Sequence, residues 1–142
     1  MMTTVVSLLL FAVFGFLSGI HFYWGLGGKR GFEAAVPTGP NQEKVMAPST
    51  WACFVVGFGL LCFGIFALIS AHLIPVHLPG RLSDAGLGII AAIFILRATG
   101  EFNYVGFFKK IKTTRFGKMD TKYYSPLCLT IGILCILLAW AT

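Results

Sequence analysis

The stretch WACFVVGFGLLCFGIFALISAHLI at 51–74 decides the fold of this protein, because it contains no Asp, Glu, Lys or Arg. An apolar run of about 18 or more residues with so few charges is typical of a helix that crosses a membrane. Three further runs of this kind lie at about 5–26, 82–105 and 124–141. The sequence therefore predicts an all-α protein, a four-transmembrane-helix bundle that forms a single integral membrane domain over 1–142.

The composition favours the same class. Hydrophobic residues make up 57% of the chain and charged residues 11%, whereas soluble domains average about 45–50% and about 25%. The alternating pattern of membrane barrel strands is absent, which indicates a helical bundle. The first run lacks a basic segment before it and a small-x-small cleavage site after it, so we expect it to be retained as the first helix.

Lysine and arginine are distributed unevenly over the predicted loops, with nine in the first and third loops and only Arg81 in the second. By the positive-inside rule, the first and third loops should lie in the cytoplasm and both termini on the extracytoplasmic side of the cell membrane. This explains the net charge of +6 without a nucleic-acid partner. The partner that the charge indicates is a bilayer with anionic headgroups, which we expect to be contacted by Lys109, Lys110, Lys112 and Arg115.

Two charged residues interrupt the third apolar run, and they are the strongest candidates for a site. Arg97 lies roughly 20 Å along the helix counted from Asp84, at a depth where an unpaired charge costs several kcal/mol. Glu101 follows four residues later on the same helical face, so we expect it to be the first partner of Arg97. The pair is either structural, with Arg97 also able to extend to the headgroups, or part of a functional polar site.

His21 and Trp24 lie near the end of the first helix, at a depth comparable with that of Arg97. We expect Arg97 to face His21, and Tyr104 to close the same pocket toward the cytoplasm. His21 is either a hydrogen-bonded packing residue or a group for ligand binding or proton transfer. Tyr23 and Trp24 also suit an aromatic belt at the membrane interface.

Metal and cofactor sites are not expected, and no catalytic residue can be named. The four cysteines lie in apolar helix sequence without a CxxC spacing, so we expect small buried hydrophobic residues with free thiols: Cys53, Cys62, Cys128 and Cys135. His72 and His77, with Asp84 nearby, offer too few ligands for a metal. Triad, HExxH and P-loop patterns are absent.

Several segments resemble a bacterial family of short four-helix membrane proteins, catalogued only as a domain of unknown function (3995). They are RATGEFNYVGFFK at 97–109, TRF at 114–116, Asp120, YYSPL at 123–127, HFYWGLGG at 21–28 and Val36-Pro37. The resemblance implies the four-helix fold and a bacterial inner membrane, and it implies no activity. It marks seven candidate ligand-binding residues toward the cytoplasmic side: His21, Trp24, Arg97, Glu101, Tyr104, Asp120 and Tyr124.

Three functions fit these observations. The first is binding or transport of a small or lipid-like ligand at a cytoplasm-facing polar site, with a homo-oligomer or another membrane protein as a candidate partner. The second is a structural or accessory subunit of another membrane protein, whose polar groups should be closed by internal pairs. The third is a small membrane enzyme acting on a lipid-like substrate, in which His21, Glu101 or Asp120 should converge on one point.

Cysteine-accessibility labelling tests the orientation. Single cysteines placed near residues 40 and 115 should be labelled from the cytoplasm, and one at residue 78 from outside, because the basic loops are retained on the cytoplasmic side. The opposite labelling pattern would refute the orientation and leave the four spans unaffected.

Overall fold

A computed structural model describes all residues of the chain, 1–142, and every regular element in it is helical. Four helical segments are long and apolar enough to cross a membrane, which confirms the predicted fold class and makes the chain a multi-pass membrane protein. The long helices are α1 (Met2–Gly25), α3 (Thr50–Ser70), α4 (Gly80–Thr99) and α6 (Ser125–Ala141). The short elements are α2 (Phe32–Ala35), α5 (Arg115–Met119) and the π-helical turn η1 (Asp120–Tyr124).

α4 and the start of the last span differ most from the predicted bounds. α4 ends at Thr99 instead of 105, because Gly100 has φ +83° and a Cβ there would meet the Val105 carbonyl oxygen. The last span begins at Arg115 instead of 124, since α5 and η1 continue directly into α6. Thr114 caps this start, with its Oγ1 accepting a hydrogen bond from the Gly117 N–H at 3.0 Å. The cap lies in basic sequence, which hydropathy assigns to a loop.

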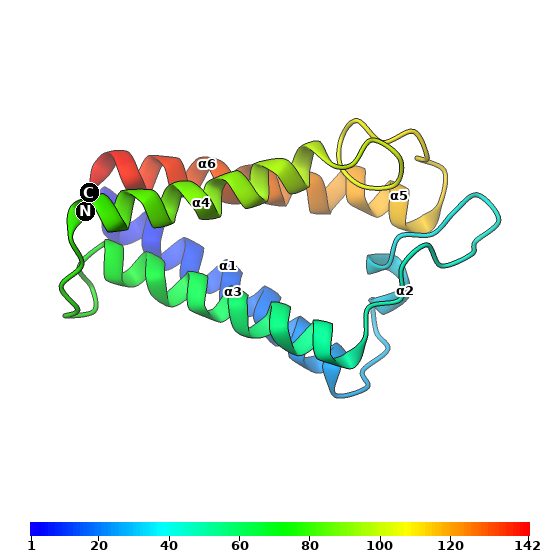
Figure 1. Cartoon of the computed structure of the whole chain (residues 1–142), viewed down its shortest axis with the longest axis horizontal. Helices are drawn as coiled ribbons and strands as arrows, with labels where there is room; N and C mark the ends of the chain where they lie inside the picture. The colour runs from blue at the N-terminus through cyan, green and yellow to red at the C-terminus, as the bar shows by residue number, and fades with distance from the viewer.

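The four long helices form two antiparallel pairs, α1 with α3 and α4 with α6, that meet at one end of the molecule and diverge toward the other (Figure 1). We call the first end the termini end, because both chain termini and the turn 71–79 lie there. The second is the loop end, where segments 26–49 and 100–114 lie. The two pairs therefore lie farther apart at the loop end than at the termini end.

Fully buried apolar side chains join the pairs where they meet. Leu10 and Phe14 of α1 pack in one cluster with Leu87 of α4 and Leu138 of α6, all at 0% exposure. Phe14 also contacts the ring of Phe94, with 5.4 Å between ring centroids. Of the four cysteines, all of which are free, two are buried, one is intermediate and one is exposed.

The pairing of α1 with α3 depends on glycines. A Cβ at Gly64 would lie 3.3 Å from the Cβ of Phe14 and 3.5 Å from the Cα of Phe11. Closer to the loop end, Ser18 Oγ of α1 donates a 2.7 Å hydrogen bond to the Gly57 carbonyl oxygen of α3. Small residues allow such backbone approach, which stabilises helix pairs in membranes through packing and interhelical hydrogen bonds.

Replacing Gly64 by leucine should separate α1 from α3. We expect Gly64→Leu to lower the free energy of unfolding by about 1–3 kcal/mol through overpacking. The matched control is Gly88→Leu, because nothing lies within 4 Å of a Cβ at that position of α4. Thermal unfolding of both purified variants in detergent, followed by circular dichroism, gives the comparison. Equal midpoints would contradict the close α1–α3 contact.

Candidate functional site

A large cavity lies between the two helix pairs on the side of the loop end. Its volume is about 1080 Å³, and 15 of its 20 lining residues are hydrophobic. All four long helices contribute, together with residues of the segment 30–35 and of η1. Ligand pockets commonly span about 300–1,000 Å³ with mostly apolar walls and a few polar groups. The cavity therefore has the size and the lining of a ligand site.

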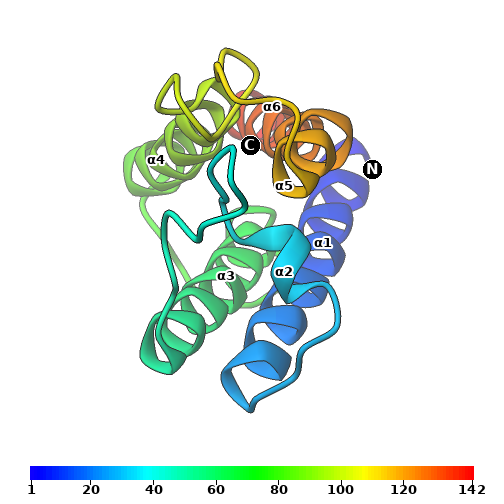
Figure 2. The same ribbon diagram turned by 90° about the vertical axis from the view of Figure 1, so that its right-hand side faces the viewer.

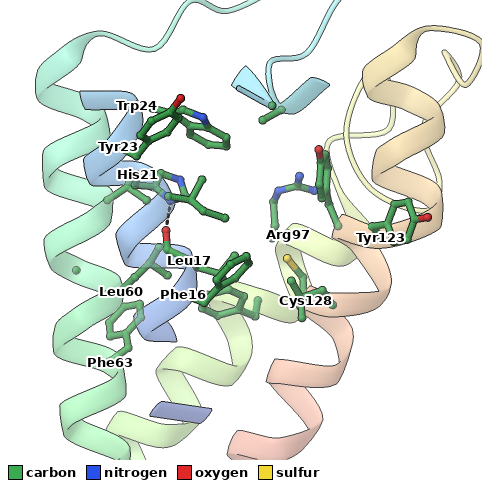
Figure 3. A pocket seen from close by; sticks show the side chains of 18 of the residues that line it. Phe16, Leu17, His21, Tyr23, Trp24, Leu60, Phe63, Arg97, Tyr123 and Cys128 are labelled. Atoms are coloured by element: carbon green, nitrogen blue, oxygen red, sulfur yellow. Dashed lines mark hydrogen bonds between the residues drawn. The ribbon is translucent and has the colours of Figure 1, made fainter. Parts of the chain in front are cut away.

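The lining changes from apolar to polar along three of the four membrane spans. On α1, Phe16 and Leu17 lie deeper than His21 and Trp24, as Figure 3 shows. α4 and the last span repeat this order, because their lining residues nearer the termini end are apolar and those nearer the loop end are polar or aromatic. α3 contributes no polar side chain to the lining. The deep residues on these helices are Leu60, Phe63, Ile93, Phe94, Leu127 and Cys128, and the polar or aromatic ones are Arg97, Tyr123 and Tyr124.

The segment 30–35, which includes α2, forms a roof between the helix pairs at the loop end. Figure 2 shows α2 lying between the α1–α3 pair and α5. Trp24 Nε1 of the first pair donates to the Arg30 carbonyl oxygen at 2.9 Å. Tyr124 Oη, beside the second pair, donates to the Ala34 carbonyl oxygen at 3.2 Å. The roof is thus hydrogen-bonded to both pairs.

Arg97 lies in the last turn of α4, about 26 Å from the first residue of the helix at 1.5 Å per residue. Arg97 therefore lies closer to the loop end than predicted, because α4 begins at Gly80, before Asp84, from which the position was counted. A cation in the last turn also interacts favourably with the helix dipole. Its guanidinium projects into the cavity, on the side opposite His21 (Figure 3). The expectation that Arg97 and His21 share one pocket is therefore met.

Asp120 is the partner of Arg97. Arg97 Nη2 donates to Asp120 Oδ1 at 3.0 Å, and the Asp120 side chain has no exposed surface. The other oxygen, Oδ2, accepts from Lys109 Nζ at 2.9 Å and from the Gly106 N–H at 2.8 Å. Buried charges are tolerated when they are paired and hydrogen-bonded in this way. The carboxylate consequently joins α4, the segment 100–114 and η1 in one network.

The predicted pairing of Arg97 with Glu101 is wrong. Helical geometry does not reach Glu101, because α4 ends at Thr99 and Gly100 turns the chain away. Glu101 is exposed, and its Oε1 accepts hydrogen bonds from the backbone N–H groups of Tyr104 and Val105. Neither Glu101 nor Tyr104 lines the cavity, so Tyr104 does not close the pocket.

The predicted role of Lys109 at lipid headgroups is also wrong. The Lys109 side chain has 0% exposure, and its Nζ donates to Asp120, to the Gly106 carbonyl oxygen at 2.9 Å and to Thr121 Oγ1 at 2.6 Å. A buried ammonium needs such donors to be satisfied, and this one has three acceptors. Lys110 and Lys112, by contrast, are exposed.

His21 presents one ring nitrogen to its own helix. Its Nδ1 lies 2.7 Å from the Leu17 carbonyl oxygen, which can only accept, so Nδ1 carries the proton. The ring also packs edge-on against Trp24, with 5.3 Å between centroids. Nε2 has no partner in the chain and remains available to a molecule in the cavity.

The structure brings together four of the seven candidate residues at the cavity wall: His21, Trp24, Arg97 and Tyr124. Asp120 lies behind Arg97 and holds it, while the exposed Glu101 and the half-buried Tyr104 lie in the segment 100–114, outside the cavity lining. The sequence prediction missed Lys109 as a buried ion-pair member and the roof residue Arg30. Of the two residues that pair in the buried network behind Arg97, only Asp120 was among the candidate ligand-binding residues predicted from the sequence, through the resemblance to a family.

Asp120→Asn should destabilise the protein strongly, because it leaves two cations near one buried point. The expected loss is about 3–5 kcal/mol, as for other broken buried ion pairs. The double variant Lys109→Met, Asp120→Asn removes one of the stranded charges and should be more stable than the single variant. Thermal unfolding in detergent measures both. A single variant as stable as the wild type would show that Asp120 does not hold the cations.

Comparison with known proteins identifies a family and nothing more specific. No curated protein and no solved structure matches the chain. Residues 3–135 match the family DUF3995, which is described as a protein of unknown function. This match covers nearly the whole chain, including all four long helices except the last residues of α6. The chain therefore belongs to the DUF3995 family of proteins of unknown function.

Proposed function

We propose that this membrane protein binds a lipid-like small molecule in the cavity between its two helix pairs. The observation that supports the proposal most directly is the change from an apolar interior to a polar rim along α1, along α4 and from α6 to η1, opposite the wholly apolar lining of α3. A molecule with a hydrocarbon part and a polar end would match this change, with its polar end beside the roof. The lining residues described above all belong to one chain.

The surface of the bundle supports access from the bilayer. Several lining residues keep a large exposed fraction, including Phe16 at 69%, Val56 at 45% and Ile93 at 46%. We propose that these residues lie at openings of the cavity. They are apolar and belong to membrane-spanning helices, so an apolar molecule could enter sideways without crossing water.

The enzyme and accessory alternatives have less support. An acid–base site would need acidic groups beside His21, whereas Asp120 is occupied by two cations and Glu101 lies outside the cavity. An accessory role would leave the polar groups closed by internal pairs. Lys109 and Asp120 are closed in this way, but the Arg97 Nη1 atom is buried without a hydrogen-bond partner.

We also propose that the loop end faces the cytoplasm of a bacterial inner membrane, as the basic residues indicate. Lys110, Lys112 and Arg115 are exposed there, and Arg115 retains 73% of its side-chain exposure. Its nearest acid, Glu33, is 4.0 Å away and equally solvated, so this contact contributes little. These three cations are free to attract anionic headgroups, which would position the cavity rim at the interface.

Filling the cavity should abolish binding of a neutral amphiphile. Gly59 lines the cavity and nothing lies within 4 Å of a Cβ there, so Gly59→Phe should place its ring in the open space. The probe is a brominated oleyl alcohol, which quenches tryptophan fluorescence at short range. In a Trp51→Phe, Trp140→Phe background, Trp24 is the remaining tryptophan and lines the cavity. We expect saturable quenching in phosphatidylcholine nanodiscs and its loss in Gly59→Phe.

The matched control is Gly88→Phe, which adds the same ring at an equally open glycine that does not line the cavity. Quenching in this variant should equal that of the background protein. Quenching that rises without saturation, or that is the same in the two phenylalanine variants, would show that the probe only samples the surrounding bilayer.

A further inference from the structure

We infer that the molecule bound in the cavity carries an anionic head group, a carboxylate or a phosphate, which binds the guanidinium of Arg97. This inference rests on the proposed function and specifies its ligand. It combines the hydrogen bonding of Arg97, the charges around the cavity and the orientation of the apolar walls.

The guanidinium of Arg97 is only partly used by the protein. Nη2 donates to Asp120 Oδ1, whereas Nη1 is buried and has no hydrogen-bond partner. A buried charged donor without a partner is unfavourable. The Arg97 side chain as a whole is 34% exposed, so a ligand in the cavity can contact it. Because guanidinium N–H groups form a planar fork, Arg97 can bind Asp120 with one part and a carboxylate or phosphate oxygen with another.

The charge of the cavity wall has one sign. Arg30 and Arg97 are both among the lining residues, and no aspartate or glutamate is. Behind the wall, one carboxylate faces two cations, since Asp120 pairs with Arg97 and with Lys109. The cluster therefore keeps one excess positive charge, and Arg97 is its member that reaches the cavity. In a site with apolar walls this charge acts on a ligand more strongly than it would in water.

Asp120 also fixes the direction of the guanidinium. The carboxylate is held by the Lys109 ammonium and the Gly106 N–H, so it cannot follow Arg97 if the arginine moves. Across the cavity, the free Nε2 of His21 can accept a hydrogen bond from a hydroxyl group of the ligand (Figure 3). An arginine whose position is set by a buried network needs little reorganisation to receive an anion.

The apolar walls then determine how the rest of the molecule lies. From Arg97 the cavity extends toward Phe94 of the same helix and toward Leu60 and Phe63 of α3. A hydrocarbon chain attached to the anion would point toward the termini end, into the membrane. Its head group would remain near the exposed cations of the loop end, which is the orientation that lipids of that leaflet already have.

Competition against the brominated alcohol tests the inference in the same nanodiscs. Oleyl phosphate and oleyl alcohol share one chain and differ in the charge of the head group. We expect the phosphate to displace the probe from the background protein at a concentration at least about tenfold lower, as one charge-assisted hydrogen bond allows. Arg97→Gln should remove this preference, so that the phosphate and the alcohol displace the probe at similar concentrations within this variant. Lys109 and Asp120 still form a balanced pair in it.

Two further variants separate charge at the site from charge nearby. Arg97→Lys keeps the cation and should retain part of the preference. Arg115→Gln removes an exposed cation outside the cavity lining and should retain all of it. Comparing phosphatidylglycerol with phosphatidylcholine as competitor shows whether the anion belongs to a phospholipid. A preference that depends on Arg97 in either the single-chain or the phospholipid comparison supports the inference and identifies the source.

Equal displacement by charged and neutral competitors, in the background protein and in Arg97→Gln, would overturn the inference while leaving the binding of amphiphiles intact. Absence of saturable probe binding in the background protein would instead refute the proposed function. The comparison within the background protein decides between these outcomes even if Arg97→Gln does not fold.

Discussion

The ion-pair network of Asp120 is the interaction on which the loop end of this protein depends. One buried carboxylate receives donors from the last turn of α4, from a lysine and a backbone N–H of the segment 100–114, and lies itself on η1. In a region with little water, none of these charged groups could stay buried alone. The network thus joins the irregular segment 100–114 to α4 and η1 and holds Arg97 in its position.

The remaining architecture follows from an unequal distribution of contacts. Apolar side chains such as Phe14 and Leu138 are packed completely at the termini end, where the helix pairs meet. Toward the loop end the pairs diverge, and the space between them is bordered by aromatic and polar side chains. A bundle packed along its whole length would have no interior site, so the divergence is the structural basis for the ligand proposed above.

The sequence predicted the spans well and the site partly, and the difference has a physical origin. A long apolar run predicts a membrane-spanning helix from local composition alone, without knowledge of the residues that the helix contacts. The partner of Arg97 depends on where α4 ends, and Gly100 in a left-handed conformation ends it before Glu101 can share its face. Asp120 lies far along the chain, and a basic segment does not reveal that Lys109 turns inward. Spacing rules within one helix cannot identify such contacts between segments.

The two helix pairs are connected much more weakly at the loop end, through the roof, than at the termini end. At the termini end the pairs are joined by close-packed side chains, which behave as a stiff joint. At the loop end, segment 30–35 is tied to the first pair through Trp24 and to the second through Tyr124, by one hydrogen bond each. Any widening of the space between the pairs must stretch one of these two bonds, while the packed joint hardly changes. The two helix pairs can therefore separate at the loop end while they stay packed at the termini end. The two hydrogen bonds of the segment 30–35 limit the width of a molecule that can lie between the pairs.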